Sequence, residues 1–462
     1  MVNSKILAVV IVAIVIVAAV GAYVVLQSDD ERQLIDAELK VYGNADKNDK
    51  IDNSDIRVIE DIISGDKSFG DHPLADANHD GKVDASDIEQ VRKIINVKPG
   101  EQIVIWHINV FDGKENAVST KYPIASAVAT GAANSLLVFK YLGINDEIKG
   151  LSYAGAPDST LFPEFQKHVG ADKRLGSSAT AMSTDLVSNL ASGPEKVTAV
   201  ITADNRSYLA TEEPILEEMG IDVVRLQAAA VDEKEYLSSI LLIAFLFEDG
   251  KKGFVNKCHE LIGWYSDFLD DLNGKLEKVD KRASAVTSSS TRAISSARSD
   301  YTDVLRAAGA LFPEGIPDTS SATLSYTGGV DTWLNAIDID YVILLRTSVD
   351  TAQDSFSWYK GEAEKEREGS SIVGGAKVLR EYINNFKTLE CFEKGNVYVV
   401  CGDMPVMLRI AYCAQILYPD IFGEDYGDKY NLDFVKKFFG WNEDMVKGKP
   451  FFVSQDSLKM DY

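Results

Sequence analysis

Residues 254–282 read FVNKCHELIGWYSDFLDDLNGKLEKVDKR. Apolar side chains recur in this stretch at intervals of three and four, which predicts one apolar stripe along an α-helix. The stripe consists of Phe254, Cys258, Leu261, Ile262, Tyr265, Phe268, Leu269, Leu272, Leu276 and Val279. A helix of this length would extend for roughly 40 Å. That length suits a strut between two lobes, but one helix of an ordinary bundle would show the same periodicity, so the flanking sequence has to decide.

The composition is that of a globular protein with more than one domain. The 462 residues are 45% hydrophobic and 26% charged, and chains of this length usually divide into domains. The net charge of −24, without any basic run, argues against nucleic acid as a partner. Four cysteines are too few for a disulfide framework and none stands in a CxxC pair, although one bridge among them remains open.

The first residues of the chain predict a membrane segment. Residues 6–26 contain no charged side chain, with Lys5 before them and acidic residues soon after. Such a run is long enough to cross a bilayer as a helix. A cleaved signal peptide is the alternative, but its apolar region is usually shorter. We therefore expect residues 1–27 to be an uncleaved single-pass anchor in the cell membrane, with the bulk of the chain extracytoplasmic.

A duplicated acidic loop follows the predicted anchor. Residues 44–55 read NADKNDKIDNSD and residues 76–87 read DANHDGKVDASD. Oxygen atoms at alternating positions of a twelve-residue loop are the ligand pattern of calcium. The expected ligands are Asn44, Asp46, Asn48, the Lys50 carbonyl, Asp52 and Asp55 in the first loop, and Asp76, Asn78, Asp80, the Lys82 carbonyl, Asp84 and Asp87 in the second. Two calcium sites are predicted, the second stronger, because the first loop has Asn44 and Asp49 where the second has Asp76 and Gly81.

The paired loops, each with a final aspartate and a following amphipathic helix, resemble a type I dockerin over residues 38–97. The resemblance implies a small all-α domain, residues 36–98, that folds around calcium. It also implies a cohesin-like module as a possible partner, with docking residues near Asn53-Ser54 and Ala85-Ser86. A solvated acidic loop without calcium is the alternative.

Two stretches of alternating strands and helices flank the long helix. In residues 101–253 we predict strands at 103–110, 124–128, 151–153, 173–175, 197–202 and 223–226. In residues 283–462 we predict strands at 283–287, 341–345 and 396–401, with a serine-rich turn at 288–299. Such alternation predicts a parallel sheet covered by helices. The expected fold is therefore α/β, with two parallel-sheet lobes joined by the helix at 254–282.

The order of several motifs resembles the helix-bridged (class III) solute-binding proteins of ABC importers. The motifs are the turn Asp112-Gly113, YLG at 141–143, PEKVTAVI at 194–201, MGIDVV at 219–224 and LYPDIF at 417–422. The resemblance covers about residues 101–440. It implies capture of a ferric siderophore, heme or cobalamin between two lobes. It also implies an ABC permease partner that docks on an acidic residue of each lobe, here Asp185 and Asp331, where glutamate is more usual.

Ligands of open parallel sheets bind beyond the carboxyl ends of the strands. In the first lobe this rule selects Tyr153, Arg206 and Tyr208. In the second lobe we select Arg292, Tyr326, Arg346 and Trp358 as side chains able to hold a large, partly anionic metal chelate.

The predicted function is that of a membrane-anchored substrate-binding protein, not an enzyme. The sequence contains no GxSxG, HExxH or P-loop motif, and its five histidines form no ligand or triad spacing. Two alternatives remain open: a dockerin-bearing extracellular enzyme such as a polysaccharide hydrolase, or an adhesion or scaffold protein assembled through the calcium loops.

Overall fold

The computed structural model describes most of the chain after residue 36. The described residues are 37–130, 133–152, 174–177, 180–205, 207–228, 231–288, 291, 293–317, 319, 321, 323–325, 334–348, 355–358, 370–441 and 443–459. No helix within these ranges is long and apolar enough to cross a bilayer. The predicted anchor at residues 1–27 lies outside them.

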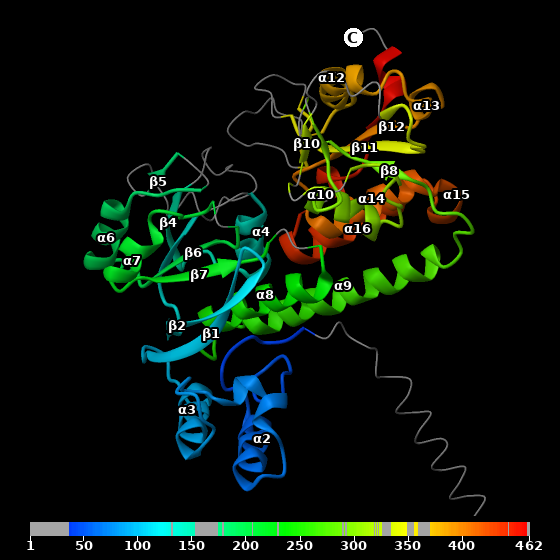
Figure 1. The fold of residues 1–462 in the computed structure, drawn as a ribbon. Helices are drawn as coiled ribbons and strands as arrows, with labels where there is room; N and C mark the ends of the chain where they lie inside the picture. Colours follow the sequence, from blue (N-terminus) through cyan, green and yellow to red (C-terminus); the bar gives the residue numbers. More distant parts are fainter. Residues whose placement is uncertain are drawn as a thin grey trace, which may run out of the picture. The chain divides into compact units, whose positions relative to one another are not determined.

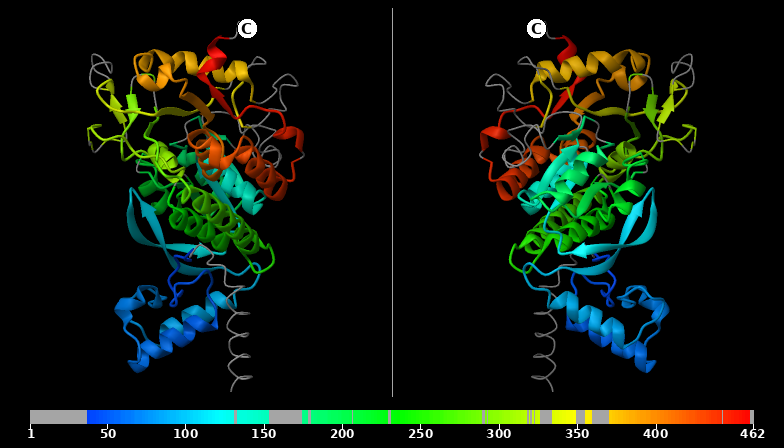
Figure 2. Two further views of the ribbon diagram at one scale, coloured as in Figure 1. Left: turned by 90° about the vertical axis from the view of Figure 1, so that its right-hand side faces the viewer. Right: turned by 90° about the vertical axis from the view of Figure 1, so that its left-hand side faces the viewer.

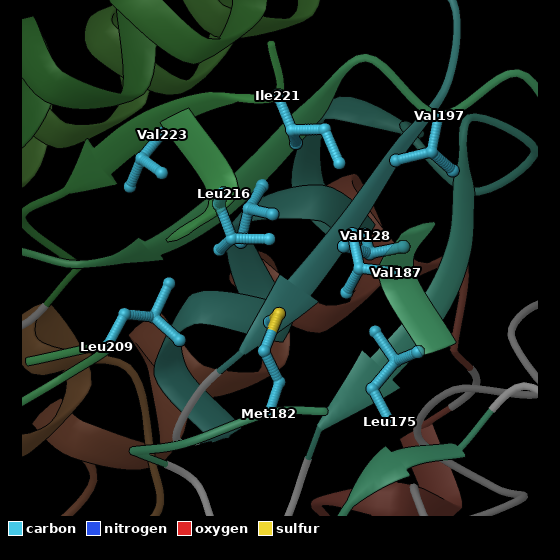
Figure 3. Close-up of a cluster of buried hydrophobic side chains, with 10 residues drawn as sticks. Val128, Leu175, Met182, Val187, Val197, Leu209, Leu216, Ile221 and Val223 are labelled. Carbon is cyan, nitrogen blue, oxygen red and sulfur yellow. The ribbon is translucent and has the colours of Figure 1, made fainter. Parts of the chain in front are cut away.

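The first lobe is built on a five-stranded parallel sheet with the order β5-β4-β3-β6-β7 (Figure 1). Its strands are β3 (Ala127–Thr130), β4 (Ile148–Ser152), β5 (Arg174–Gly176), β6 (Ala199–Ala203) and β7 (Asp222–Leu226). Its helices are α4 (Ala133–Leu142), α6 (Thr184–Ser192), α7 (Glu213–Glu218) and α8 (Glu233–Phe247). Val128, Leu216 and Val223 meet in one buried cluster between the sheet and its helices (Figure 3). The predicted α/β class with a parallel sheet is confirmed.

Two local predictions in this lobe were wrong. The strand expected at 124–128 begins only at Ala127, because the Ile124 N–H bonds to the Leu246 carbonyl at 2.7 Å, beside α8 and off the sheet. The helix α8 was not predicted at all. Its residues from Tyr236 to Phe247 are almost all buried, so it has no polar face and gives no periodic signal.

A separate hairpin, β1 (Ile103–Phe111) and β2 (Lys114–Tyr122), turns at Asp112-Gly113 as predicted (Figure 2). Both turn residues have positive φ, 52° and 74°, as tight hairpin turns require. The hairpin also closes the outer edge of the first-lobe sheet. The Asn109 amide donates to the Val223 carbonyl at 2.8 Å and accepts from the Arg225 N–H at 3.1 Å, which occupies exposed backbone groups of β7.

The second lobe has a four-stranded sheet with the order β13-β12-β11-β8. Its strands are β8 (Ala285–Val286), β11 (Tyr341–Arg346), β12 (Val397–Cys401) and β13 (Phe452–Ser454). The first three are parallel as predicted, but β13 is an antiparallel edge strand near the end of the chain. The stretch at 288–299, predicted as a turn, contains the short strand β9 (Ala293–Ser295), which pairs with β10 (Thr323–Ser325).

Along the chain, the helices of the second lobe lie between the strands of this sheet. They are α10 (Asp300–Ala307), α12 (Ile372–Tyr382), α13 (Glu390–Glu393), α14 (Val406–Leu417), α15 (Pro419–Phe422) and α16 (Tyr426–Phe434). A π-helical turn, η5 (Val435–Phe439), continues α16. Short 3₁₀ segments η4 (Ile383–Asn385), η6 (Glu443–Met445) and η7 (Gln455–Lys459) complete the lobe.

The long helix α9 extends from Phe254 to Leu276, six residues shorter than predicted. At 1.5 Å per residue its length is about 35 Å. Beyond it, the N–H groups of Lys278 and Val279 bond three residues back instead of four. Leu276 is the last fully packed residue of the stripe, and with no further burial the charged residues that follow do not sustain the helix.

Both lobes pack on α9. From the first lobe, α4 and α8 contact it, and α8 runs alongside it (Figure 1). From the second lobe, Asp433 accepts a hydrogen bond from the Trp264 indole at 2.6 Å, and Tyr430 donates to Asp271 at 2.9 Å. Trp264 also meets the Phe434 ring edge-on, with centroids 5.1 Å apart. Trp264 is buried although the apolar stripe read from the sequence omitted it.

Two glycines test the packing of the long helix and of its second-lobe neighbour. A Cβ at Gly427 in α16 would collide with the buried Tyr412 ring, whereas one at Gly263 in α9 meets open space. We expect Gly427→Ala to lower the free energy of unfolding by about 1–3 kcal/mol through overpacking. Gly263→Ala, the matched control, should raise it by about 0.5–1 kcal/mol through helix propensity. Urea unfolding measures both; equal effects would contradict the packing described.

Candidate functional site

The second acidic loop, residues 76–87, folds around the side chain at its first position. The Asp76 carboxylate accepts hydrogen bonds from the N–H groups of Asp80 at 3.0 Å and Gly81 at 2.8 Å. Gly81 has a φ of 89°, in the left-handed region that favours glycine. The Asn78 and Asp80 side chains accept from the N–H groups two residues ahead. Gly81 is the sixth residue of the loop, the position at which calcium loops have a glycine for their sharp turn.

The last position of each loop is a buried aspartate that ties the loop to the next helix. Asp87 accepts from the N–H of Asn78 at 3.2 Å and of Asp84 at 2.8 Å, at the start of α3 (Ala85–Ile95). Asp55 makes the equivalent two bonds at the start of α2 (Asn53–Ser64). The internal repeat read from the sequence is therefore also a repeat of geometry. The two helices contact each other through a shared core that includes Ile59 and Val91.

The first loop differs from the second at its first position. Asn44 is fully buried, and its amide nitrogen donates to the carbonyls of Leu39 and Asn48, both at 2.7 Å. These two bonds fix the orientation of the amide, so its oxygen is the remaining atom. That oxygen is buried and has no hydrogen-bond partner among the described residues. A buried acceptor without a donor is costly, and a cation at the loop centre would satisfy it.

The carboxylate at the last position of each loop is in an environment that disfavours its charge. Burial, with added repulsion from the charge of Asp46, raises the pKa of Asp55 to about 7. Burial also raises the pKa of Asp87, with added repulsion from Asp76 and Asp84. A divalent cation reverses this balance, since it favours the ionised form of every carboxylate that faces it.

Side chains alone do not form a finished metal site. Across the described ranges, no three carboxylate, thiolate or imidazole groups stand gathered as a metal ion would hold them. Half of the predicted ligands of the first loop are amide or carbonyl oxygens. A cluster defined only by carboxylate, thiolate and imidazole groups does not include these oxygens. The donor chemistry therefore fits calcium at the orphaned Asn44 oxygen, while occupancy of both loops stays a prediction.

The loop region packs against the rest of the chain. Residues Ala37–Tyr462 form one compact unit. The Leu39 N–H bonds to the Asn48 carbonyl in the first loop, and the next residues pair with β1, with Tyr42 N–H to the Trp106 carbonyl at 2.9 Å. The His79 ring of the second loop lies between the rings of Tyr42 and Trp106, with centroids 4.6 and 4.5 Å away.

A contact between the first loop and the long helix also holds the loop region against the rest of the chain. Asp49, in the first loop, lies 3.0 Å from the His259 ring nitrogen of α9. Asp49 stands where the second loop has glycine, which was taken from the sequence as a weakness of the first loop. Its observed contact gives this departure a second role, in packing.

A cavity of about 700 Å³ lies at this junction. Its walls come from the segment before the first loop, from β1 and β2, and from the start of α8, and include Glu38, Lys40, Tyr42, Glu115 and Lys234. The charged walls pair with each other: Lys40 with Glu115 at 2.5 Å and Lys234 with Glu38 at 3.8 Å. Four of the charged side chains in the cavity wall therefore compensate one another in pairs.

At the carboxyl end of the first-lobe sheet, the structure describes one of the three predicted binding residues. Tyr208 is half-buried in the loop after β6, and burial raises its pKa. Thr130 and Thr202, at the ends of β3 and β6, form a buried hydrogen bond of 2.5 Å. Tyr153 and Arg206 lie outside the described residues.

In the second lobe, the structure describes two of the four predicted residues. Arg346 ends β11, and its guanidinium lies 5.5 Å from the centre of the Tyr382 ring. Trp358 is only 2% exposed, and its indole N–H donates to the Asn431 side chain at 2.9 Å. Trp358 is therefore a core residue, and it is not retained as a ligand contact. Arg292 and Tyr326 lie outside the described residues.

Of the two predicted docking residues, Asp185 is exposed in the first turn of α6, as a contact with another protein requires. Leu186 beside it is also exposed, at 38%. Asp331 lies outside the described residues.

Solved structures share this fold. The chain is similar to the TroA-like periplasmic binding protein FepB from Veillonella parvula, with a TM-score of 0.53, 13% identical residues, and coverage of 72% of this chain and 95% of that chain. It is also similar to Helicobacter pylori CeuE with Ni(II) bound, with a TM-score of 0.50, 16% identity, and coverage of 75% and 98%. No protein-family model and no curated protein matches the chain. The fold is thus that of TroA-like periplasmic binding proteins.

We expect His107, in β1, to make the stability of the chain sensitive to acid. Its fully buried side chain has a pKa lowered by burial from 6.5 to about 4. The unfolded chain takes up a proton near pH 6.5 and the folded chain does not, so stability is lost as pH falls from 6.5 towards 4. The loss should reach about 3 kcal/mol.

We expect His107→Leu to flatten this acid-side decline in the free energy of unfolding, measured by urea unfolding from pH 7 to pH 4. His107→Gln, which stays polar but cannot titrate, is the matched control and should flatten the decline as well. A decline as steep in both variants as in the parent chain would assign the acid sensitivity to other groups.

Proposed function

We propose that this protein is the extracytoplasmic substrate-binding component of an ABC importer and that it captures a metal chelate between its two lobes. One observation carries the proposal: the fold of nearly a whole TroA-like binding protein, 95% of its length, is present here around a helix contacted by both lobes. That neighbour is a periplasmic binding protein by its description, and the second has Ni(II) bound.

The proposed mechanism is binding without turnover. Two lobes packed on one stiff helix present a largely preformed ligand site, so little conformational entropy is lost on capture. A micromolar affinity needs only about −8 kcal/mol. Arg346 and Tyr208, at the carboxyl ends of β11 and β6, are the described side chains proposed to contact the ligand. A ferric siderophore is the first candidate, with heme and cobalamin as further candidates.

The remaining parts of the proposal concern location and partners. Residues 1–27 are proposed to anchor the chain in the cell membrane and so keep it near its permease. Asp185 is proposed to contact that permease, because it is an exposed acidic side chain on a first-lobe helix. The dockerin-like region at 36–98 packs on the body of the chain, which favours a role in bracing it over a role in docking a cohesin-like module.

Titration of the full-length chain tests the proposed function. We expect saturable quenching of tryptophan fluorescence by at least one of a ferric catecholate, a ferric trihydroxamate, heme and cobalamin, with a Kd of about micromolar or tighter. A polysaccharide-release assay on the same sample tests the alternative of an extracellular hydrolase. Polysaccharide release without binding of any chelate would replace the receptor by that enzyme.

Calcium at the two loops is tested separately. If calcium is present at about a hundred times its Kd, the folded state should gain about 2.7 kcal/mol. We expect EGTA to lower the Tm of the full-length chain, and Asp87→Asn to reduce that response because it removes a carboxylate at the last position of the second loop. Asp71→Asn, an exposed acid between the loops, is the matched control and should respond like the parent. A Tm independent of calcium would exclude the metal from both loops.

A further inference from the structure

Arg409 is a buried cation without a hydrogen-bond or ion-pair partner among the described residues. It lies in α14 and is 5% exposed, in a helix whose every residue is buried. Its Nε is fully buried without a hydrogen-bond partner, and no hydrogen bond or ion pair joins the guanidinium to any described residue. Charged side chains are almost never this buried unless they are paired.

Three neutral groups close enough to feel the charge of Arg409 come from both lobes. Its positive charge lowers the pKa of the Tyr141 and Tyr236 hydroxyls and of the Cys413 thiol, against the stronger effect of their burial. Tyr141 lies in α4 and Tyr236 in α8, both in the first lobe, whereas Arg409 and Cys413 lie in α14 of the second. The Tyr236 ring also meets Tyr265 of α9 at 6.2 Å. Arg409 therefore lies where the two lobes and the long helix meet.

Two carboxylates next to α14 are already engaged. Asp403, just before the helix, accepts from the Ser357 hydroxyl at 2.7 Å and from the Trp358 N–H at 3.0 Å. Asp428 accepts from the Tyr412 hydroxyl at 2.6 Å. The guanidinium cannot lose its proton at any pH that the protein survives. Its charge therefore stays, and an uncompensated buried charge is strongly destabilising.

The position of α14 adds positive potential. The helix begins directly after the loop that leaves the carboxyl end of β12, which is the edge where open parallel sheets bind ligands. Its first residue follows Pro405, and no side chain caps its amino end. The free N–H groups and the helix dipole there favour an anion, as the guanidinium does.

We propose that Arg409 recognises an anionic oxygen of the captured ligand, with the hydroxyls of Tyr141 and Tyr236 beside it. The ligand class is then a chelate with a carboxylate, catecholate or phosphate group, and ligands without such a group are disfavoured. This inference rests on the proposed function for the identity of the ligand. The residue would act by pairing its fork of donors with two oxygens of the anion.

Two substitutions at this position separate recognition from packing. Arg409→Met removes the charge at similar length, and Arg409→Lys keeps the charge but loses the two-pronged geometry. We expect Arg409→Met to weaken binding of a ferric catecholate by about a hundredfold or more and Arg409→Lys by about tenfold. Binding of a ferric trihydroxamate, which has no anionic group left free, should stay within about twofold in both. Arg380→Met, at an exposed position of α12, is the matched control and should change neither.

The Tm of the ligand-free chain is the second readout. An unpaired buried cation costs stability, so Arg409→Met should have a Tm equal to or higher than that of the parent chain. A structural arginine would give the opposite, because its loss would lower the Tm and leave the affinity for the catecholate unchanged; that result overturns the proposal. Equal weakening for both chelates overturns it as well.

A third arm separates this inference from the proposed function. If the parent chain binds none of the chelates, the proposed function fails, and the anion site is judged by inorganic phosphate against chloride at matched ionic strength. A Tm raised by phosphate in the parent and not in Arg409→Met supports an anion site at this residue. The same Tm in both salts overturns it. Should Arg409→Met fail to fold, Arg409→Lys and the phosphate response of the parent carry the test.

Discussion

The apolar stripe of α9 is the constraint on which the two lobes depend. Helices from both lobes cover it: α4 and α8 from the first lobe, and α16 from the second. Trp264 lies at the centre of this arrangement. Its ring packs on Phe268 and Phe434. Its indole N–H donates a hydrogen bond to Asp433, so the polar atom of this side chain has a fixed partner in an otherwise apolar interface. The helix thereby sets where each lobe can attach.

The second constraint is the short segment from Leu39 to Tyr42, which is hydrogen-bonded both to the first acidic loop and to β1. Leu39 is bonded to the first acidic loop from both its N–H and its carbonyl, and Tyr42 is bonded to β1. The hairpin that begins with β1 in turn covers the free edge of β7 through Asn109. A change in the order of the acidic loop would thus reach the first-lobe sheet through a series of backbone and side-chain hydrogen bonds.

The sequence predicted those features that a repeating pattern encodes, and missed those that depend on partners far along the chain. The stripe of α9 and the alternation of strands and helices were readable because burial has a period. The helix α8 was invisible for the opposite reason, since it is buried on nearly every side. Trp358 was misread as a binding residue because its partner, Asn431, lies 73 residues later and no local signal announces it. The end of α9 was placed too late because the stripe continues in sequence, to Val279, after the packing has stopped.

The candidate binding residues show the same limit. Topology alone placed Tyr208 and Arg346 at the carboxyl ends of β6 and β11, where the structure has them. Arg409 was overlooked although its signal was present: one cation in an otherwise apolar helical stretch, residues 406–418. A buried arginine forms an ion pair in most proteins. The residues next to Arg409 in sequence do not reveal whether it has such a partner.

A comparison of two buried arginines shows why the pairing matters. Arg225, in β7, is 3% exposed and follows the same sequence signature, a cation within an apolar run. It forms an ion pair with Glu213, donates to the Ala203 carbonyl at 2.8 Å, and lies 4.0 Å above the Phe111 ring. Both terminal nitrogens of that guanidinium have partners within the first lobe, so the cost of burying the charge is compensated on folding.

Arg409 is equally buried and lacks each of these partners among the described residues. Folding alone does not compensate its charge, and in a protein that is only marginally stable such a cost is a large share of the total. The two arginines therefore differ in which group compensates their positive charge. The charge of Arg225 is compensated within its own lobe. The charge of Arg409 is left for a bound anion to compensate, and the free energy gained when that pair forms contributes to the affinity for the anion.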